Sequence, residues 1–176
     1  LADVPCIGDS LRDLQAAVSA GAIPVLVLTG KGQDTRDKEP IPEGTLVFND
    51  LAERFKKRGI IVILSDFFDD PARILAGLKH FRHRRHEVIV FHVLDPAEVD
   101  FPFRETTLFK GLEGMPDLLT DPIGLRRAYQ EELGTFLEAL RKGCRSIDID
   151  YVPLRTDQEL DGPLSSYLAS RGARVR

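Results

Sequence analysis

The sequence predicts an α/β domain with a mainly parallel sheet. Five short apolar runs alternate along the chain with segments of helical periodicity. Apolar and β-branched residues fill these runs almost completely, which is typical of strands that are covered on both faces. Alternation of such strands with helices indicates βαβ units and a parallel sheet. We therefore expect a three-layer, Rossmann-like or flavodoxin-like domain.

The residues up to position 58 predict two strands, two helices and a loop. Asp9 or Ser10 can cap the first helix, and Gly21 suits the position after its end. The predicted elements are, in order, a strand at Val4–Ile7, a helix at Leu11–Ala20, a strand at Pro24–Leu28, a polar loop at 30–45, and a helix from Asn49 or Asp50 to about Arg58.

The rest of the chain predicts three further strands, three helices and a hairpin. Two helices start with Asp followed by Pro, which gives an N-cap and a proline at the first helical position. The elements are a strand at Ile60–Leu64, a helix from Asp70-Pro71 to about Arg82, a strand at Glu87–Leu94, a small hairpin within 104–120 that pairs Thr106–Phe109 with Asp117–Thr120, a long helix from Thr120-Asp121-Pro122, a strand at Ile149–Leu154 and a helix at Pro163–Arg171.

Length and composition exclude several classes of protein. The 176 residues, of which 43% are apolar, are expected to form one domain, 1–176, with a sizeable core. The net charge of −4 argues against nucleic-acid binding through bulk charge, and no apolar run approaches the roughly 20 residues that span a bilayer. Cys6 and Cys144 suit a reducing cytoplasm, and we expect both to be buried as small apolar residues. Because position 1 is Leu and Met115 is the only methionine, we expect a processed or excerpted product.

Aspartates follow four of the five predicted strands within three residues. Ligands of open parallel sheets bind beyond the carboxyl ends of the strands, so these aspartates are candidate site residues. Asp9 and Asp13 lie four residues apart, which suits a Mg²⁺ ion, although the same residues could cap the helix and complement its dipole. Asp66 could bind a metal or a ligand, or could form hydrogen bonds within its loop.

Two other segments have both a functional and a structural interpretation. Thr29-Gly30-Lys31-Gly32 could contact phosphate, but the chain has no GxxxxGK[ST] motif, and a flexible loop is the alternative. His80, His83 and His86 have a spacing that could bind zinc, but their arginine and lysine neighbours favour a basic, solvated helix end. His92 lies inside a strand, where we expect its ring to be hydrogen-bonded within the core.

Residues 4–50, with the string GDSLRDLQAA, resemble the carboxyl-terminal part of heptose bisphosphate phosphatases of the haloacid dehalogenase superfamily. In this resemblance the string is the fourth motif of the superfamily, whose acidic residues hold Mg²⁺. The resemblance assigns that role to Asp9 and Asp13. The family also needs a DxD nucleophile motif on its first strand, which this chain lacks, so the resemblance leaves the phosphatase chemistry without its aspartyl nucleophile.

Residues 51–174, which include GIIVILSDFFDDPARILAGL and GCRSIDIDYVPLRTDQ, resemble the carboxyl-terminal half of a von Willebrand A-like family. The family commonly accompanies MoxR-type AAA+ ATPases, so the resemblance implies such an ATPase as a protein partner. It also implies that Asp66 occupies the position of a metal-ion-dependent adhesion site, although the DxSxS motif of that site is missing. The sequence is therefore interpreted as a chimera of a segment at 1–50 and a segment at 51–176.

The two resemblances together predict one five-stranded sheet. If Val4–Ile7 takes the place of the missing von Willebrand strand, the strand order is 2-1-3-4-5. Asp9, Asp13 and Asp66 then converge into a hybrid Mg²⁺ site. The candidate ligand-binding residues beside this site are Ser10, Thr29, Lys31 and Ser65.

Three functions follow from these interpretations. The first is a domain recombined from two families, either naturally or by engineering, that lacks a complete catalytic set and whose acidic edge binds Mg²⁺ and serves ligand or protein binding. The second is a Mg²⁺-dependent phosphomonoester hydrolase of the haloacid dehalogenase type that uses Asp9, Asp13 and Asp66. The third is a structural scaffold without a ligand. The absent nucleophile motif favours the first function over the enzyme.

Overall fold

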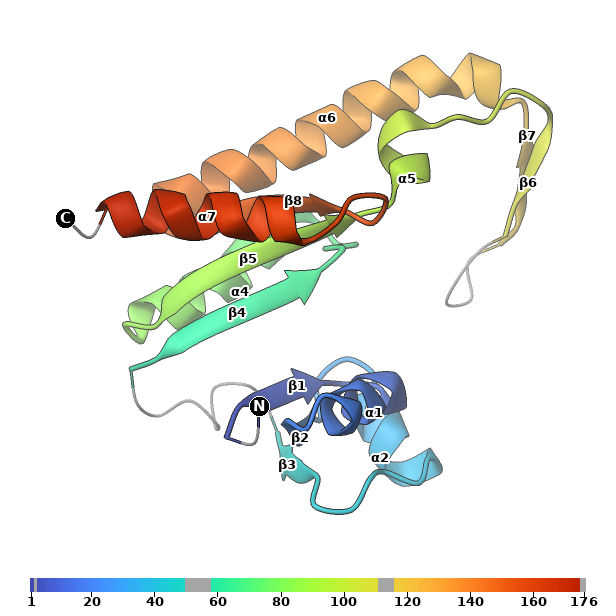
Figure 1. Cartoon of the computed structure of the whole chain (residues 1–176). Helices are drawn as coiled ribbons and strands as arrows, with labels where there is room; N and C mark the ends of the chain where they lie inside the picture. Colours follow the sequence, from blue (N-terminus) through green and yellow to red (C-terminus); the bar gives the residue numbers. More distant parts are fainter. Residues whose placement is uncertain (2, 50–57, 111–115, 175–176) are drawn as a thin grey trace. The chain divides into compact units, whose positions relative to one another are not determined.

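The structure is a computed structural model that describes residues 1, 3–49, 58–110 and 116–174 (Figure 1). The chain divides into two compact units, Leu1–Arg58 and Gly59–Arg176, and each is built on its own parallel sheet. Parallel strands alternating with helices confirm the predicted α/β class. The single five-stranded sheet is not confirmed, because the strand ladders form two separate three-stranded sheets.

The first unit contains a parallel sheet in the order β1-β2-β3. Gly8 of the first strand lies beside Leu26, and Val27 lies beside Phe48 of the third. The elements are β1 (Pro5–Gly8), α1 (Leu11–Ser19), β2 (Ile23–Val27), α2 (Gly32–Lys38) and β3 (Leu46–Phe48).

The core of the first unit lies between α1 and the middle strand β2. Leu14 and Ala17 on the inner face of α1 have no exposed surface, and neither do Val25 and Leu26 of β2. Spacing of three along α1 puts both of its residues on one helix face. The unit therefore has a small apolar centre that fixes α1 against the strands.

The structure corrects the prediction of a polar loop at 30–45. The helix α2 occupies Gly32–Lys38, and β3 follows the remaining turn at Leu46–Phe48. Six of the seven α2 residues are polar or charged, so no apolar period marks the helix. An ion pair between Lys38 and Asp34, one turn apart, supports the helix instead. The helix predicted from Asn49 or Asp50 to Arg58 lies mostly outside the described residues.

The second unit contains a parallel sheet in the order β4-β5-β8 and a separate antiparallel hairpin, β6-β7. The predicted hairpin is confirmed at the same place in the chain. The elements are β4 (Ile60–Ser65), α4 (Pro71–His83), β5 (Glu87–Leu94), α5 (Pro96–Asp100), β6 (Thr107–Phe109), β7 (Leu118–Thr120), α6 (Pro122–Ser146), β8 (Asp150–Arg155) and α7 (Asp161–Arg174).

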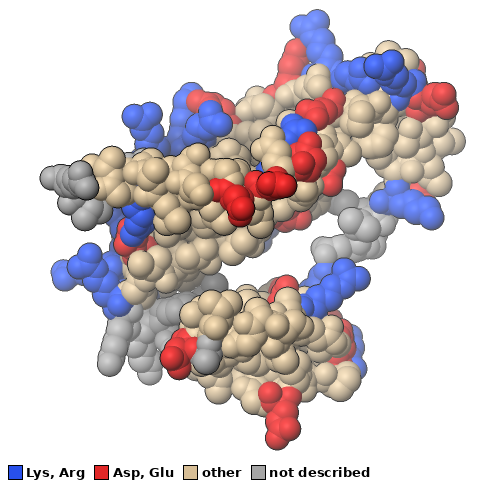
Figure 2. Space-filling model, viewed as in Figure 1, with Lys and Arg blue, Asp and Glu red and all other residues tan. Residues whose placement is uncertain are grey.

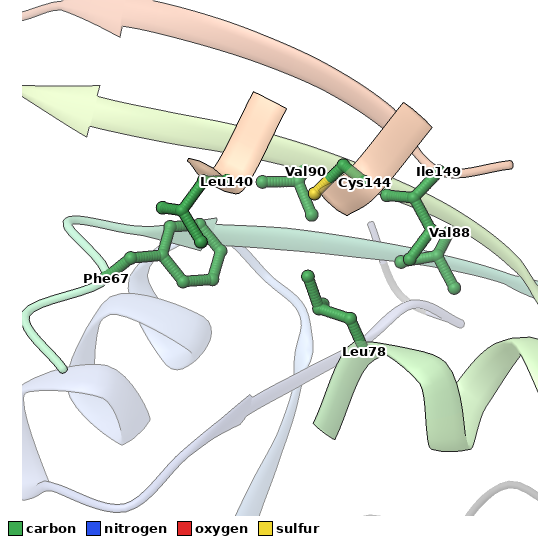
Figure 3. Packing of buried hydrophobic residues seen from close by; sticks show 7 residues of the cluster. All are labelled: Phe67, Leu78, Val88, Val90, Leu140, Cys144 and Ile149. Atoms are coloured by element: carbon green, nitrogen blue, oxygen red, sulfur yellow. The ribbon is translucent and has the colours of Figure 1, made fainter. Parts of the chain in front are cut away.

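Helices α4 and α6 cover one face of this sheet, and their apolar side chains meet those of the strands (Figure 3). Leu78 of α4 and Leu140 of α6 are almost completely buried there. The Cys144 thiol lies in the same layer, and burial raises its pKa to about 11. The thiol therefore stays protonated at neutral pH, as expected of a small apolar core residue.

Helix α7 packs on the opposite face of the sheet, over β5 and β8 (Figure 1). Leu164 and Tyr167 of α7 pack against a buried cluster of β5 and β8 side chains. Polar contacts hold the same helix: the Tyr167 hydroxyl donates to the Asp150 carboxylate at 2.9 Å, and Arg171 forms an ion pair with Glu87. The three-layer arrangement of this unit is thus completed by one helix on this face.

His92 lies at the centre of the second unit with no exposed surface, and both ring nitrogens are hydrogen-bonded, which confirms the prediction for this residue. Nε2 lies 2.9 Å from the carbonyl oxygen of Asp66, which can only accept, so Nε2 carries the hydrogen. Nδ1 therefore accepts from the Tyr151 hydroxyl at 2.6 Å. Burial raises the pKa of Tyr151 to about 12 and keeps this donor protonated.

The remaining histidines and Cys6 need two corrections. His80 and His83 are exposed at the end of α4, as expected of a solvated helix end, but His86 is buried where β5 begins. Within the described ranges no three His, Cys, Asp or Glu side chains are placed to hold a metal ion, so the three histidines form no zinc site. Cys6 is exposed rather than buried, because it lies on the outer strand β1. None of the described helices is long and apolar enough to cross a membrane.

We predict that the His92 network makes the stability of the protein depend on pH. Burial lowers the pKa of His92 below its ordinary value of 6.5. As the pH falls below 6.5, the His92 side chain takes up a proton in the unfolded chain but stays neutral in the folded chain. The free energy of unfolding therefore has its full value above pH 6.5 and falls as the pH decreases through the lowered pKa. Urea unfolding at pH 7.5 and 5.0 should show a larger loss for the native chain than for His92→Asn.

The His92→Asn variant should also cost about 1–3 kcal/mol at pH 7.5, because buried groups lose their partners. The matched control is His80→Asn at an exposed position, which should retain the native pH dependence. Equal pH dependence of the native chain and His92→Asn would contradict the prediction.

Candidate functional site

The candidate site of the first unit begins where β1 passes into α1. Ser10 is the N-cap of α1, and its hydroxyl accepts the backbone N–H of Asp13 at 3.4 Å. In return, Asp13 Oδ2 accepts the backbone N–H of Ser10 at 3.1 Å and its hydroxyl at 2.8 Å. This is a capping box, so Ser10 rather than Asp9 caps α1, and Asp13 completes the cap in the first turn.

Gly8 allows Asp13 to lie directly against the end of β1. A Cβ atom on Gly8 would lie 2.1 Å from the Cβ atom of Asp13 and 2.4 Å from its Oδ2. Any larger residue at position 8 would displace the Asp13 side chain. Asp13 therefore returns to the strand end one helical turn after Asp9, as the four-residue spacing predicts.

Asp9 is held by the loop that follows the neighbouring strand β2. Its Oδ2 accepts the backbone N–H of Lys31 at 3.0 Å, and its carbonyl oxygen accepts the Thr35 hydroxyl at 2.8 Å. Gly30 has a φ of +58°, and a Cβ atom there would lie 2.1 Å from Asp9 Oδ2. The loop thus forms a cradle for this carboxylate that only glycine permits at position 30. We call Asp9 with these loop contacts the Asp9 cradle.

The cradle contains one residue that the sequence does not reveal. Thr35 is 3% exposed and ties α2 to the Asp9 backbone, but a single threonine in a polar run has no pattern that marks it. Thr29 and Lys31, which are predicted ligand-binding residues, lie in the same loop and are exposed. The Thr29 carbonyl oxygen accepts the N–H of Gly32 at 3.0 Å, which shapes the turn into α2.

The predicted residues of the second unit lie after β4. The Ser65 hydroxyl accepts the N–H of Phe67 at 3.0 Å, and the Asp66 carbonyl oxygen accepts a hydrogen bond from His92. The Asp66 residue is exposed, and its backbone has a structural role. Asp66 belongs to a different unit from Asp9 and Asp13, so their convergence on one ion stays a prediction.

The chain contains one Asp-x-Asp string, Asp148-Ile149-Asp150, but it lies at the amino end of β8. The Asp150 carboxylate accepts a hydrogen bond from the Tyr167 hydroxyl there, and its Oδ2 lies 3.7 Å from Arg171 Nη1. Ligands of parallel sheets bind at the opposite, carboxyl end of the strands. The string therefore does not supply the nucleophile motif that the phosphatase resemblance requires.

These features define the first unit as an α/β segment with an acidic strand-to-helix loop. Residues 1–54 match the model of the HAD-hydrolase-like family, where HAD stands for haloacid dehalogenase. The curated relatives are D-glycero-beta-D-manno-heptose-1,7-bisphosphate 7-phosphatases. The protein of Bordetella bronchiseptica is 60% identical over 52 residues, which cover 30% of this chain and 29% of the relative.

Two Pseudomonas relatives give the same result. The phosphatases of Pseudomonas putida and Pseudomonas aeruginosa are each 59% identical over 46 residues, or 26% of this chain. Those residues cover 26% and 25% of the two relatives, so the chain spans less than a third of the proteins it matches. No solved structure matches the chain.

The comparisons correct the preferred function. A recombined domain that serves ligand or protein binding is wrong as the main interpretation, because the matches point to a HAD-type phosphatase, the second of the three functions. The absence of the DxD motif therefore does not favour the first function over the phosphatase. The family match ends at residue 54. The von Willebrand A-like resemblance of 51–174, the chimera and the AAA+ partner therefore stay predictions.

We predict that Gly30→Ala disrupts the Asp9 cradle. The new Cβ atom would displace the Asp9 carboxylate, and the Lys31 N–H would lose its acceptor. The free energy of unfolding should fall by about 2–3 kcal/mol, of which about 1 kcal/mol comes from the positive φ alone. Amide hydrogen exchange of Lys31 should become faster, which NMR can measure.

Gly44→Ala is the matched control, because Gly44 has a φ of +81° and open space around its Cβ position. This variant has the backbone strain without the collision. Equal destabilisation of the two variants, with unchanged exchange at Lys31, would show that the cradle does not depend on Gly30.

Proposed function

We propose that residues 1–54 form the magnesium-holding part of a phosphomonoester hydrolase of the haloacid dehalogenase type. The observation that carries this proposal is the Asp9 cradle, which fixes a carboxylate at the carboxyl end of β1. It lies in the segment that is 60% identical to the Bordetella phosphatase. The names of the relatives support a sugar phosphate as the substrate class.

The residues of the cradle fit a Mg²⁺ ion. Within the described part of the unit, the hydrogen bonds of the Asp9 and Asp13 side chains end on Oδ2. Oδ1 of each carboxylate can therefore accept another ligand. Mg²⁺ is usually held by one or two carboxylates together with waters and substrate phosphates, so a set of three protein ligands is not required. The fit rests on these oxygen donors and on the space that Gly30 leaves for Asp9.

Each residue of the cradle has a separate task in the proposed site. A bound Mg²⁺ supplies positive charge that offsets the charge of a substrate phosphate. The Lys31 N–H and the Thr35 hydroxyl fix the side chain and the backbone of Asp9, so that its free oxygen keeps one position. Ser10 and Asp13 fix the start of α1. The exposed side chains of Thr29 and Lys31 are proposed to face the substrate.

The proposed chemistry needs a strand beside β1. The resemblance places the aspartyl nucleophile on a first strand that pairs with the strand before the GDSLRD loop. Among the described strands of its sheet, β1 pairs with β2 alone, so its other edge is proposed to take such a neighbour. The five-stranded order with Asp66 as a third ligand would put β4 at the same edge, so the two arrangements exclude each other. The phosphatase matches favour the nucleophile strand.

We predict that Mg²⁺ binds to the chain at the Asp9 cradle. Titration should shift the backbone NMR signals of Ser10 and Lys31, because the Ser10 N–H donates to the Asp13 carboxylate and the Lys31 N–H donates to the Asp9 carboxylate. Asp9→Asn should weaken the apparent affinity about 10-fold or more, since one negative ligand is lost. Asp34→Asn is the control at an exposed position of the same unit and should bind Mg²⁺ as the native chain does. Unchanged signals at millimolar Mg²⁺ would contradict the site.

We predict Mg²⁺-dependent phosphate release when the nucleophile strand is supplied. The full chain is mixed with the amino-terminal part of the Bordetella phosphatase, up to the start of the 52-residue match. Release of phosphate from the heptose 1,7-bisphosphate should require both polypeptides. Asp9→Asn should lower the rate by about 100-fold or more, since charge stabilisation of the phosphate is lost. Equal rates for Asp9→Asn and Asp34→Asn would refute the proposed role of Asp9.

A further inference from the structure

One arginine binds two carboxylates at the carboxyl end of the second sheet. Arg155 is the last residue of β8. Its Nη1 and Nη2 donate to Oδ1 and Oδ2 of Asp100 at 3.1 and 2.7 Å. Its Nε and Nη2 donate to Oδ1 and Oδ2 of Asp157 at 3.0 and 2.9 Å. Paired contacts of this kind fix a guanidinium in one orientation. We call these three side chains the Arg155 latch.

The latch joins α5 to the loop that follows β8. Asp100 is the last residue of α5, and Asp157 lies two residues after the end of β8. At the start of α5, the Thr156 hydroxyl donates to Asp95 Oδ2 at 3.3 Å, and the Thr156 N–H donates to the Leu94 carbonyl oxygen at 3.0 Å. Both ends of α5 are therefore tied to the same loop, next to the end of β5 (Figure 1).

Helix α5 depends on these polar contacts because its own structure is costly. It has five residues, whereas an isolated helix needs about 12–15 in water, and none of its side chains is buried. It ends at Phe101, which has a φ of 45° and a ψ of 62°, a left-handed conformation that is strained for a residue other than glycine. Stacking of the Phe101 ring on Tyr129, with 4.6 Å between the ring centres, holds this conformation. We therefore expect the wound and unwound states of α5 to lie close in free energy.

The charges around α5 make it sensitive to the loss of Arg155. Residues 95–100 and 155–161 contain six Asp and Glu residues, and Arg155 is the single Lys or Arg among them. Figure 2 shows acidic side chains gathered where α7 begins, next to α5. Hydrogen bonds from the Arg155 guanidinium lower the pKa of Asp100 and Asp157, so both carboxylates stay ionised at neutral pH. Without the guanidinium these carboxylates would repel each other.

We propose that α5 is a conformational switch whose helical state is set by the Arg155 latch. While the latch is closed, α5 stays wound beside the loop that follows β8. When the latch opens, Asp100 and Asp157 separate and α5 unwinds between β5 and Phe101. Unwinding removes α5 from the carboxyl ends of β5 and β8, the edge at which parallel sheets bind ligands. The inference does not rest on the proposed phosphatase function, because no residue of the Asp9 cradle takes part.

Amide hydrogen exchange, measured by NMR on the full chain, tests the switch. The reporters are the N–H groups of Val99 and Phe101, which donate to the carbonyl oxygens of Asp95 and Ala97. Arg155→Gln should raise both exchange rates about 10-fold or more, because it removes two charge-assisted contacts and leaves like charges together. Exchange in the β4-β5 ladder should stay unchanged, since the opening is local. Unchanged exchange at Val99 and Phe101, or an equal rise in the ladder, would overturn the proposal.

Arg127→Gln is the matched control. Arg127 forms an exposed ion pair with Glu131 at 2.8 Å on α6, so its substitution removes the same charge without touching the latch. An equal rise of α5 exchange in both variants would count against the latch. Circular dichroism and the melting temperature show whether each variant is folded. Asp100→Asn opens the latch from its other side and replaces Arg155→Gln if that variant does not fold.

A double-mutant cycle tests whether Arg155 and Asp100 act through the same contact. Asp100→Asn alone should also speed the exchange of Val99 and Phe101. The double variant Arg155→Gln/Asp100→Asn should exchange no faster than the faster single variant, because either change already opens the latch. Rate increases that multiply in the double variant would mean that the two side chains act independently, and would refute the latch.

Discussion

The hydrogen bond between the Lys31 N–H and the Asp9 carboxylate is the contact on which the first unit depends. It joins the loops after two neighbouring strands, and it exists only because Gly30 has no side chain. Positions 8 and 32 also need glycine. A Cβ atom on Gly8 would collide with Asp13, and a Cβ atom on Gly32 would collide with the Val27 carbonyl oxygen. Three glycines thus give two acidic side chains a fixed place at one edge of a small sheet.

The second unit uses a buried polar centre instead of a glycine-lined loop. His92 joins β5 to the end of β4 through the Asp66 carbonyl and to β8 through Tyr151. Rings of Phe67, Phe136 and Tyr151 surround it edge-on. A neutral imidazole satisfies a donor and an acceptor at once, so this side chain fixes the relative positions of all three strands without burying a charge.

The sequence predicts the strands and the long helices well because their signals are local. The apolar runs of β4 and β5 and the Asp-Pro starts of α4 and α6 are confirmed within a few residues. It does not predict α2, whose polar residues lack a period, or the role of Thr35, which arises only when two loops meet. The Asp9 and Asp13 spacing indicates the candidate site, but the capping box that occupies Asp13 Oδ2 depends on backbone geometry. The likeness of residues 1–54 to phosphatases is supported by the relatives, because the acidic loop by itself has both a structural and a metal-binding interpretation.

One of the two cysteines is exposed and the other is buried, so a thiol reagent can label the native chain at a single site. The Cys144 thiol is buried with a pKa of about 11, so it reacts slowly with maleimides at neutral pH. Cys6 is exposed on β1, two residues before the acidic loop begins. A fluorescent dye would therefore attach to Cys6 alone, without any mutation. Its emission and anisotropy would report the arrival of a neighbouring strand beside β1 as it happens.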